Sequence, residues 1–349
     1  MSTSAPTRTT RDAVVYFQSR DGITCNLIHV QGDRTPDKGP VILVHGAGVR
    51  ANIFRAPVKA TIVDLLLDAG YDVWMENWRA SIDLTPFRWS LDQAALYDHP
   101  AAVEKVVEES GSRHVKAIVH CQGSTSFCLS SVLGLLPQVS TIVTNAVSLH
   151  PIVPPEAWLK LKVAVPLLAR MTPYVDPQWG IEAPTLLAKA LTALVKLTHH
   201  ECDNTVCRWA SFAYGVGFPT LWRHENLDEA THEWLSSEFA AVPLLFFQQM
   251  RRCVAAGHLI PHDLGAAMPQ NPVARKPQTD ARFAFFAGAM NRCFLPESQE
   301  RTFGWMDAIK PDYHSLNIIP EYAHLDVFMG KNAYRDVLPL MVQELDQPN

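Results

Sequence analysis

The sequence lacks the features of disulfide-rich proteins, of nucleic-acid-binding proteins, and of proteins with a signal peptide or membrane anchor. Its seven cysteines are scattered and odd in number, without the paired short spacings of a disulfide framework. It has no basic patch, and its net charge of -5 argues against a nucleic-acid partner. Residues 1–11 are polar and rich in serine and threonine, so they contain no apolar core of a signal peptide or membrane anchor. We therefore expect a cytoplasmic protein without a membrane span that begins with a flexible tail over residues 1–11.

A recognisable metal-binding pattern is also missing. The stretch HHECD at residues 199–203, with Cys207 close behind, offers several types of ligand. No second pair of ligands stands at a familiar zinc spacing, so the sequence predicts no metal site.

The sequence does contain an alternation of apolar strand-like runs and helical periodicity. Hydrophobic residues make up 48% and charged residues 19%, which is ordinary for a soluble enzyme. Because 349 residues are many for one compact domain, we expect one core domain with an insertion. Continuous apolar runs such as residues 41–44 are typical of strands covered on both faces. Repeated strand-helix units predict an α/β fold, with a mostly parallel central sheet and helices on both of its faces.

The alternation stops at about residue 151 and resumes at about residue 280. Between these points prolines cluster, and helical runs follow one another without clear strands. We predict a large, mostly helical insertion over residues 151–279, forming a lid over the site, between core parts at residues 12–150 and 280–349. Aromatic residues of this insertion, Trp222 among them, could line an apolar substrate cavity. For any single one of them, packing inside the insertion is the simpler interpretation.

The pattern at residues 115–136 predicts a strand, a sharp turn and a helix. An apolar, β-branched segment ends at the turn around Cys121, and the period then changes to about 3.6. The nucleophile elbow of α/β-hydrolases, G-x-S-x-G, has this form. Here Cys121 occupies the centre and Gly123 the second small position, whereas Val119 replaces the first glycine. Taken alone, Cys121 would more simply be a buried core cysteine, but a position at a helix N-terminus favours the reactive thiolate.

The loop His45-Gly46-Ala47-Gly48 follows a buried strand and is rich in glycine. Such a loop lets backbone N–H groups approach a ligand, so we expect those of Ala47 and Gln122 to form an oxyanion hole. A plain tight turn is the alternative interpretation. The residues expected to contact substrate are His45, Gly46, Gly48, His120 and Trp222.

A histidine on the loop after the last strand completes the expected order of groups. His324 has this position and would act as the base. The turn after the preceding strand, where an acid is expected, carries Asn291. Its side-chain oxygen can accept a hydrogen bond from the imidazole, as in Cys-His-Asn enzymes, but adds no charge. Asp263 and Asp326 are the alternatives for orienting His324.

Four stretches carry a family resemblance: VHGAGV at residues 44–49, DVWMENWRAS at 72–81, HCQGS at 120–124 and YAHLDVFMGKN at 322–332. They resemble the α/β-hydrolase domains found beside or fused to cholesterol-oxidase-like, glucose-methanol-choline-type flavoenzymes. The similarity covers about residues 12–345. It implies an α/β-hydrolase fold, with Cys121 and His324 as nucleophile and base and with asparagine at position 291 as a family trait.

The resemblance also implies a functional link to a flavin-dependent oxidoreductase. No G-x-G-x-x-G follows an early strand of this chain, so a flavin-binding domain is absent and no cofactor is expected.

The expected reaction is hydrolysis of an activated ester, lactone or thioester through an acyl-cysteine, with a bulky apolar or lipid-like acyl group. An acyltransferase or cyclase that shares this intermediate is one alternative. A non-catalytic module that binds a hydrophobic ligand or a flavoenzyme is another. The sequence leaves the oligomeric state open, a homodimer included.

Overall fold

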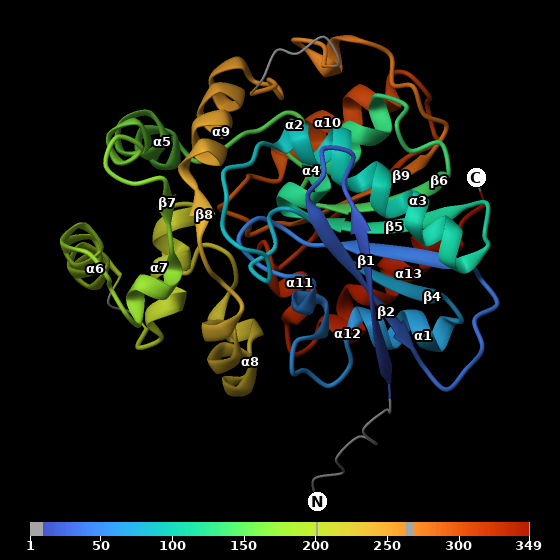
Figure 1. Ribbon diagram of the computed structural model, residues 1–349, viewed down its shortest axis with the longest axis horizontal. Coiled ribbons are helices and arrows are strands. Elements are labelled where there is room, and N and C mark those ends of the chain that lie inside the picture. Colours follow the sequence, from blue (N-terminus) through green and yellow to red (C-terminus); the bar gives the residue numbers. More distant parts are fainter. Residues whose placement is uncertain (1–9, 200–201, 263–267, 349) are drawn as a thin grey trace, which may run out of the picture.

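An eight-stranded sheet forms the centre of the computed structural model, which describes residues 10–199, 202–262 and 268–348 (Figure 1). All neighbouring strands from β4 to β10 pair in parallel, whereas β2 runs antiparallel to both β1 and β4. In spatial order the strands are β1 (Arg11–Gln18), β2 (Thr24–Gln31), β4 (Asp72–Asn77), β3 (Pro40–Val44), β5 (Val115–His120), β6 (Val139–Asn145), β9 (Arg282–Gly288) and β10 (Ser315–Ile319). The mostly parallel sheet expected from the sequence is confirmed.

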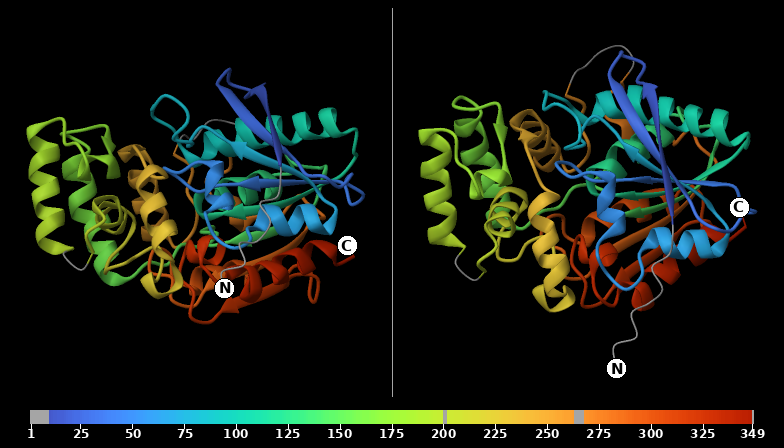
Figure 2. Two further views of the ribbon diagram at one scale, coloured as in Figure 1. Left: turned by 90° about the horizontal axis from the view of Figure 1, so that it is seen from below. Right: turned by 60° about the horizontal axis from the view of Figure 1, so that its bottom comes forward.

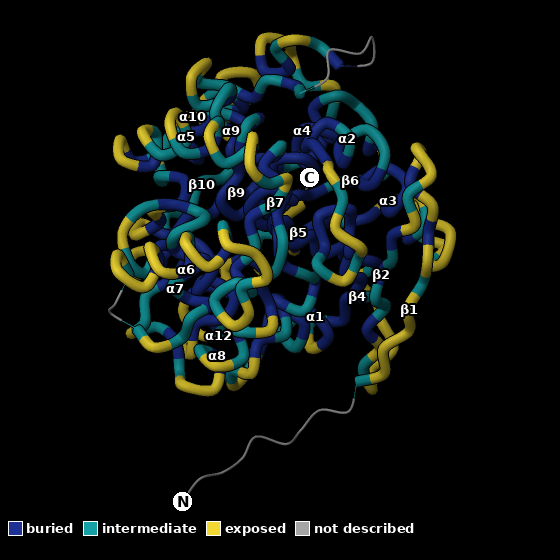
Figure 3. Tube along the Cα trace, turned by 60° about the vertical axis from the view of Figure 1, so that its left-hand side comes forward, coloured by how far each residue is buried: buried dark blue, intermediate teal, exposed yellow. Residues whose placement is uncertain are grey.

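Burial explains why the middle strands are continuous apolar runs. All five residues of β3 are buried, and so are all but one residue each of β4 and β5. The edge strand β1, by contrast, is largely exposed, as Figure 3 shows. Strands covered on both faces need apolar side chains at every position, whereas an edge strand does not.

Helices cover both faces of the sheet (Figures 1 and 2). One face carries η1 (Ala51–Arg55), α1 (Ile62–Ala69), α11 (Asp326–Met329), α12 (Ala333–Asp336) and α13 (Leu338–Asp346). The other face carries α2 (Leu91–Gln93), η2 (Ala94–Asp98), α3 (His99–Ser110), α4 (Cys121–Val132) and α10 (Glu297–Asp307).

Two helices differ from the lengths that periodicity predicts. A helix over residues 57–69 is expected, but α1 begins at Ile62 because Thr61 caps it: Thr61 Oγ1 accepts the Asp64 N–H at 3.3 Å, and Asp64 Oδ2 accepts the Thr61 N–H at 2.8 Å. A single closing helix over residues 333–345 is expected, but it is divided at Val337 into α12 and α13. Pro339 follows this break, and proline favours the first turn of a new helix over the interior of a long one.

Residues between β6 and β9 form the helical insertion, which lies to one side of the sheet (Figure 2). Its elements are α5 (Pro155–Leu168), β7 (Tyr174–Val175), η3 (Pro177–Gly180), α6 (Leu186–Thr198), α7 (Thr205–Tyr214), η4 (His224–Asn226), α8 (Glu229–Trp234), η5 (Leu235–Ser237), β8 (Val242–Pro243), α9 (Leu244–Ala256) and η6 (Pro272–Ala274). The sequence gives no clear strand here, and the structure adds only the two-residue antiparallel pair of β7 and β8 to the described helices. This pair brings the chain before α6 next to the start of α9.

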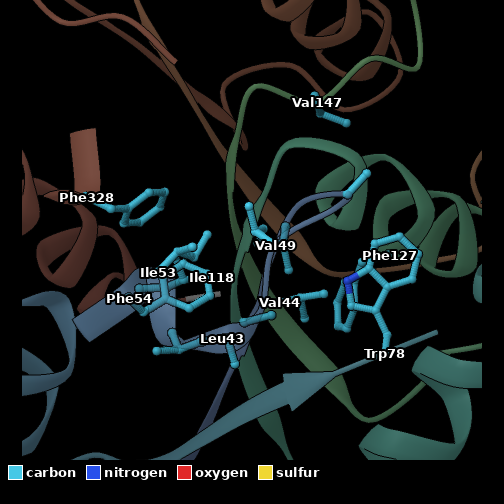
Figure 4. Close-up of a cluster of buried hydrophobic side chains, with 14 of the residues drawn as sticks. Leu43, Val44, Val49, Ile53, Phe54, Trp78, Ile118, Phe127, Val147 and Phe328 are labelled. Carbon is cyan, nitrogen blue, oxygen red and sulfur yellow. The ribbon is translucent and has the colours of Figure 1, made fainter. Parts of the chain in front are cut away.

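A cluster of buried side chains joins the sheet to the loops at the carboxyl ends of its strands (Figure 4). Phe54 of η1 and Phe328 of α11 meet edge to face with ring centroids 5.1 Å apart. Phe328 also lies 5.3 Å from the ring of His120, which ends β5. The hydrophobic core therefore extends to the turn at which β5 becomes α4. Among the described residues, no helix combines the length and apolar character needed to cross a membrane.

Candidate active site

Cys121 lies at the sharp turn between β5 and α4. Its φ of 55° is in the left-handed region, which costs a residue with a side chain about 1–2 kcal/mol. The turn is possible because the neighbouring positions are small. A Cβ on Gly123 would lie 2.1 Å from the carbonyl oxygen of His45, and one on Gly46 would lie 2.9 Å from the Cys121 Cβ. The strand-turn-helix pattern thus places Cys121 where the sequence predicts the nucleophile.

Two backbone N–H groups interact with the Cys121 thiol. They belong to Ala47, in the loop after β3, and to Gln122, the second residue of α4. The loop needs glycine at position 48, because the φ of Gly48 is 69° and a Cβ on Gly48 would lie 2.1 Å from the Tyr214 hydroxyl oxygen. The structure therefore brings together the two donors that the sequence predicts for an oxyanion hole.

His324 is brought to Cys121 by the loop after β10. The Cys121 sulfur and one ring nitrogen each of His120 and His324 all lie within 4.8 Å of one another. The two imidazole rings have centroids 4.8 Å apart. Parallel strands end at the same edge of the sheet, and this is why groups so far apart in sequence meet here.

Asn291 contacts His324, but with the opposite polarity from that expected. The Asn291 Oδ1 accepts the backbone N–H groups of Cys293 at 3.0 Å and Phe294 at 3.4 Å. This leaves Nδ2 facing Nδ1 of His324 at 3.1 Å. An amide nitrogen can only donate, so Nδ1 of His324 is the acceptor and its proton is on Nε2. The expectation that the Asn291 oxygen accepts from the imidazole is wrong for this arrangement, because the backbone uses that oxygen.

Asp326, one of the two aspartates considered for orienting His324, has other hydrogen-bond partners. Asp326 accepts hydrogen bonds from the Asn226 side chain at 2.7 Å and from the backbone N–H groups of Arg223 and Ala323 at 3.2 and 2.8 Å. Burial raises the pKa of Asp326 to about 6. Its carboxylate therefore organises the loop around the histidine. Asp263 lies outside the residues that the structure describes.

Burial keeps the resting pair uncharged. It raises the pKa of the Cys121 thiol to about 12, although the N–H groups of Gln122 and Ala47 act in the opposite direction. Burial also lowers the pKa of His324 to about 3. At neutral pH the site holds a thiol and a neutral imidazole. The thiolate expected from the helix N-terminus is not the resting form, because desolvation outweighs the helix dipole here.

Hydrogen bonds also position the two histidines near this pair, His120 and His45. Nδ1 of His120 accepts from Nδ2 of Asn145 at 2.9 Å, and the same amide donates to the His324 carbonyl at 3.1 Å. Nδ1 of His45 bonds the Gly46 carbonyl at 2.7 Å. Asn145, which the sequence analysis missed, thus joins both histidine-bearing segments, and only its place at the end of β6 could have indicated this role.

A narrow apolar cavity of about 50 Å³ opens beside Cys121. The insertion supplies most of its wall, and the lining residues are Ala47, Cys121, Gln122, Val153, Ala157, Lys160, Leu161, Ala213, Tyr214, Gly215, Phe246, Phe247, Met250, Cys293 and Phe294. A second apolar cavity of about 50 Å³ continues along α5 and shares Lys160, Leu161, Ala213 and Phe247 with the first. The two cavities are therefore neighbours with a shared wall, and we refer to them together as the channel.

Trp222 does not line this channel, contrary to expectation. Its indole is buried in the insertion, with its ring centroid 5.7 Å from that of Phe239. His45, Gly46, Gly48 and His120 are likewise not among the residues that line this cavity. They belong to the loop and the elbow, and their role as substrate contacts stays a prediction.

Lys160 is a channel residue that the sequence analysis missed. On its own helix it has the pattern of a surface charge, yet its Nζ donates to the carbonyl of Phe212 at 2.5 Å and to that of Gly215. Burial lowers the pKa of this amine to about 8. A cation therefore lies in an otherwise apolar wall.

Two groups of described side chains have the ligand types and spacing to hold a metal ion. One is His120, Cys121 and His324 at the elbow, and the other consists of two cysteines and two histidines in the insertion.

Comparison with known proteins gives a consistent result. No family model matches the chain. It is 24% identical to human lipase member K over 345 residues, spanning 89% of this chain and 82% of that protein. It is also 24% identical to sterol esterase 2 of Saccharomyces cerevisiae over 184 residues, 46% of this chain and 34% of that one.

Solved structures agree with the topology. The monoacylglycerol lipase of Paleococcus ferrophilus has a TM-score of 0.53 at 12% identity, covering 96% of this chain and 99% of that one. Naproxen esterase of Bacillus subtilis also has a TM-score of 0.53 at 12% identity, covering 97% and 93%. With its parallel sheet, its elbow and these likenesses, the chain has the α/β-hydrolase fold.

Proposed function

We propose that this protein hydrolyses activated esters, lactones or thioesters through an acyl-cysteine formed on Cys121. The observation that carries the proposal is the left-handed turn at Cys121, with the N–H groups of Ala47 and Gln122 aimed at its sulfur. Holding a side chain in this conformation is costly, and such cost is typical of functional sites. The lipase and esterase names of similar proteins support an ester as the substrate.

In the first half of the reaction the Cys121 sulfur attacks the carbonyl carbon of the substrate. The carbonyl oxygen becomes an oxyanion, to which the N–H groups of Ala47 and Gln122 donate. The thiol proton passes to Nε2 of His324 and from there to the departing alkoxide or thiolate as its bond to the acyl carbon breaks. In the second half, water gives a proton to His324 and adds to the thioester. The sulfur then leaves and recovers its proton.

His324 must change tautomer before it can act as the base. Its Nε2 carries the proton while Asn291 donates to Nδ1, so Nε2 has no free lone pair for the thiol proton. Rotation of the Asn291 amide would present its oxygen to Nδ1–H, at the loss of its bonds to the N–H groups of Cys293 and Phe294. We propose that the resting site is therefore weakly reactive and that substrate binding accompanies this rotation.

The shape of the channel favours an extended apolar acyl chain. Its wall is apolar apart from few groups such as Lys160, and it is narrow along α5. The outer face of α5 carries exposed Leu159, Val163 and Leu167. The helix is therefore apolar on its exposed face as well as on the face that lines the channel. Of the bulky apolar or lipid-like acyl groups expected from the sequence, these features favour the lipid-like chain. Because a thiolate leaves more readily than an alkoxide, esters with good leaving groups are preferred.

The proposal is tested by trapping the acyl-enzyme. The protein is mixed with p-nitrophenyl esters, a lactone and a simple acyl thioester, then quenched within milliseconds to minutes and analysed by mass spectrometry. We expect one acyl group per chain, on the peptide containing Cys121, and none in Cys121→Ala. His324→Ala should lower the acylation rate about a hundredfold or more. Cys25→Ala, which removes a buried thiol of β2 far from the channel, is the control and should acylate normally. An unreactive Cys121 in folded protein would favour a binding module instead.

An acyltransferase is the second candidate, favoured by the small exposure of the thiol. Cys121 is 9% exposed in an apolar channel, an arrangement that limits access of water to the acyl-enzyme. Single turnovers in H₂¹⁸O with added alcohols or amines separate the two functions. Label in the free acid indicates hydrolysis, and acylated acceptor indicates transfer.

We also propose that the protein works in the reducing cytoplasm. All seven cysteines are free thiols, which agrees with that compartment. The flavin-dependent partner implied by family resemblance remains part of this proposal, and co-purification from cells under mild conditions tests it.

A further inference from the structure

The insertion gathers two cysteines and two histidines at one point, away from the elbow. Cys202 precedes α7, Cys207 lies in its first turn, His224 begins η4 and His232 lies in α8. The two sulfur atoms and one nitrogen from each imidazole all lie within 4.8 Å of one another. Three segments of the chain thus bring four donor atoms together.

Two sulfur–nitrogen distances inside this cluster match those around a tetrahedral ion. Cys202 Sγ lies 3.4 Å from Nε2 of His232, and Cys207 Sγ lies 3.4 Å from Nε2 of His224. For a zinc ion with Zn–S of about 2.3 Å and Zn–N of about 2.0 Å, tetrahedral geometry puts sulfur and nitrogen about 3.5 Å apart. Two sulfur and two nitrogen donors are also the ligand set that zinc prefers.

The surroundings hold these side chains in position. The Asn204 backbone N–H donates to Cys202 Sγ at 3.3 Å, an interaction that stabilises a thiolate. The Asn204 side chain caps α7 by accepting the Cys207 N–H at 3.0 Å and donates to the His232 carbonyl at 2.7 Å. Asn204 therefore contacts three of the four donor residues, as residues around the ligands of a metal site commonly do. An open hollow at the surface is lined by Cys202, His224 and His232, which gives an ion a path to the cluster.

We propose that Cys202, Cys207, His224 and His232 bind one zinc ion. The proposal goes beyond the acyl-transfer function and does not rest on it, and it replaces the expectation that the chain has no metal site. Four protein ligands leave no position open for water or substrate, so the ion is structural. It ties the start of α7 to η4 and α8. Because α7 ends at Tyr214, which lines the channel, the ion also fixes one wall of the channel.

The sequence analysis missed this site for a geometrical reason. Residues 199–203 with Cys207 contain two of the four ligands, Cys202 and Cys207, but His199 packs against Phe212 and Phe218, and residues 200–201 lie outside the described chain. The second pair of ligands, His224 and His232, is separated by seven residues rather than by a familiar zinc-finger spacing.

The test uses full-length protein purified under reducing conditions from zinc-supplemented cells, in a Cys121→Ser background that removes the sulfur of the elbow cluster. Elemental analysis should find about one zinc per chain after dialysis. Cobalt exchanged for zinc should show the thiolate charge-transfer and strong d–d bands of a tetrahedral sulfur site. Removing the metal with a chelator should lower the melting temperature by about 5 °C or more.

Variants of two proposed ligands, and a control at a histidine outside the cluster, test the assignment of the zinc ligands. Cys207→Ser and His232→Ala should each lose the bound metal, whereas a protein with His258→Ala, a change at a half-buried histidine after α9, should retain it. Folded variants that keep one zinc would overturn the proposal. A wild-type protein that binds no zinc after reduction, or that contains a Cys202–Cys207 disulfide which reforms in the presence of zinc, would also overturn it. If the variants do not fold, the wild-type cobalt spectrum decides, because bands without thiolate charge transfer contradict the site.

Discussion

At the scale of single residues, protonation controls the proposed chemistry. Burial raises the pKa of Cys121 to about 12, above the ordinary value of a thiol, so the thiolate fraction is small at neutral pH and grows with pH. We therefore expect the rate of Cys121 alkylation by iodoacetamide to rise about tenfold per pH unit from pH 7 to pH 10. Mass spectrometry of the Cys121 peptide measures the rate. A plateau reached below pH 8 would indicate a preformed thiolate-imidazolium pair and contradict this account.

Asn291 sets the tautomer of His324, and aspartate at this position should reverse it. In Asn291→Asp one carboxylate oxygen can accept the hydrogen bonds from the N–H groups of Cys293 and Phe294. The other oxygen can accept a hydrogen bond from Nδ1–H of His324. Nε2 is then free, and the negative charge stabilises the imidazolium. We expect acylation of Cys121 at pH 7 to become about tenfold faster, with the alkylation profile moved to lower pH by about one unit or more.

Asn291→Ala is the matched control, because it removes the contact without adding an acceptor. It should be no faster than wild type. A folded Asn291→Asp protein that acylates more slowly than wild type would show that the amide orientation does not limit the reaction.

At the scale of elements, the turn between β5 and α4 depends on glycine at position 123, which has no side chain. In Gly123→Ala the new Cβ would meet the His45 carbonyl oxygen at 2.1 Å, so the loop or the helix must move. We expect a loss of about 1–3 kcal/mol in the free energy of unfolding, with acylation at Cys121 abolished. Urea unfolding and the acyl-trapping measurement check both effects.

Gly304→Ala is the control for this change. Gly304 lies within α10, and nothing lies within 4 Å of a Cβ placed there. Alanine in a helix interior should therefore stabilise the protein by about 0.5–1 kcal/mol and leave acylation unchanged. Equal effects of the two substitutions would contradict the steric explanation of the elbow.

At the scale of the whole molecule, the core supplies the proposed reacting groups and the insertion supplies most of the channel wall. Ala213 lies where the two apolar cavities meet, so a large side chain there should divide the channel. We expect Ala213→Phe to lower kcat/KM for p-nitrophenyl esters of ten or more carbons about tenfold or more, while acetyl and butyryl esters are hydrolysed as before. Steady-state kinetics over a series of chain lengths measures this selectivity.

Ala193→Phe tests whether a new phenylalanine alone disturbs the insertion. Ala193 is exposed on α6 and lines neither cavity. It should leave the chain-length profile unchanged. A uniform loss for all esters in Ala213→Phe would instead indicate damage to the elbow.

The sequence by itself determined the sheet, the elbow and the identity of Cys121, His324 and Asn291 as the groups that meet. These features follow from local rules: apolar runs form buried strands, small residues permit a tight turn, and parallel strands end at one edge. The order of the elements then places His324 near Cys121 without any knowledge of side-chain contacts.

Only the tertiary structure decided how these groups are protonated and what surrounds them. The Asn291 oxygen accepts N–H groups from the turn beyond it, and this reverses its expected hydrogen bond to His324. Burial of Cys121 depends on α5, α7 and α9, which pack over it from far along the chain. The same holds for the four proposed zinc ligands. Desolvation and hydrogen-bond polarity depend on every neighbour in space, and sequence patterns record only neighbours along the chain.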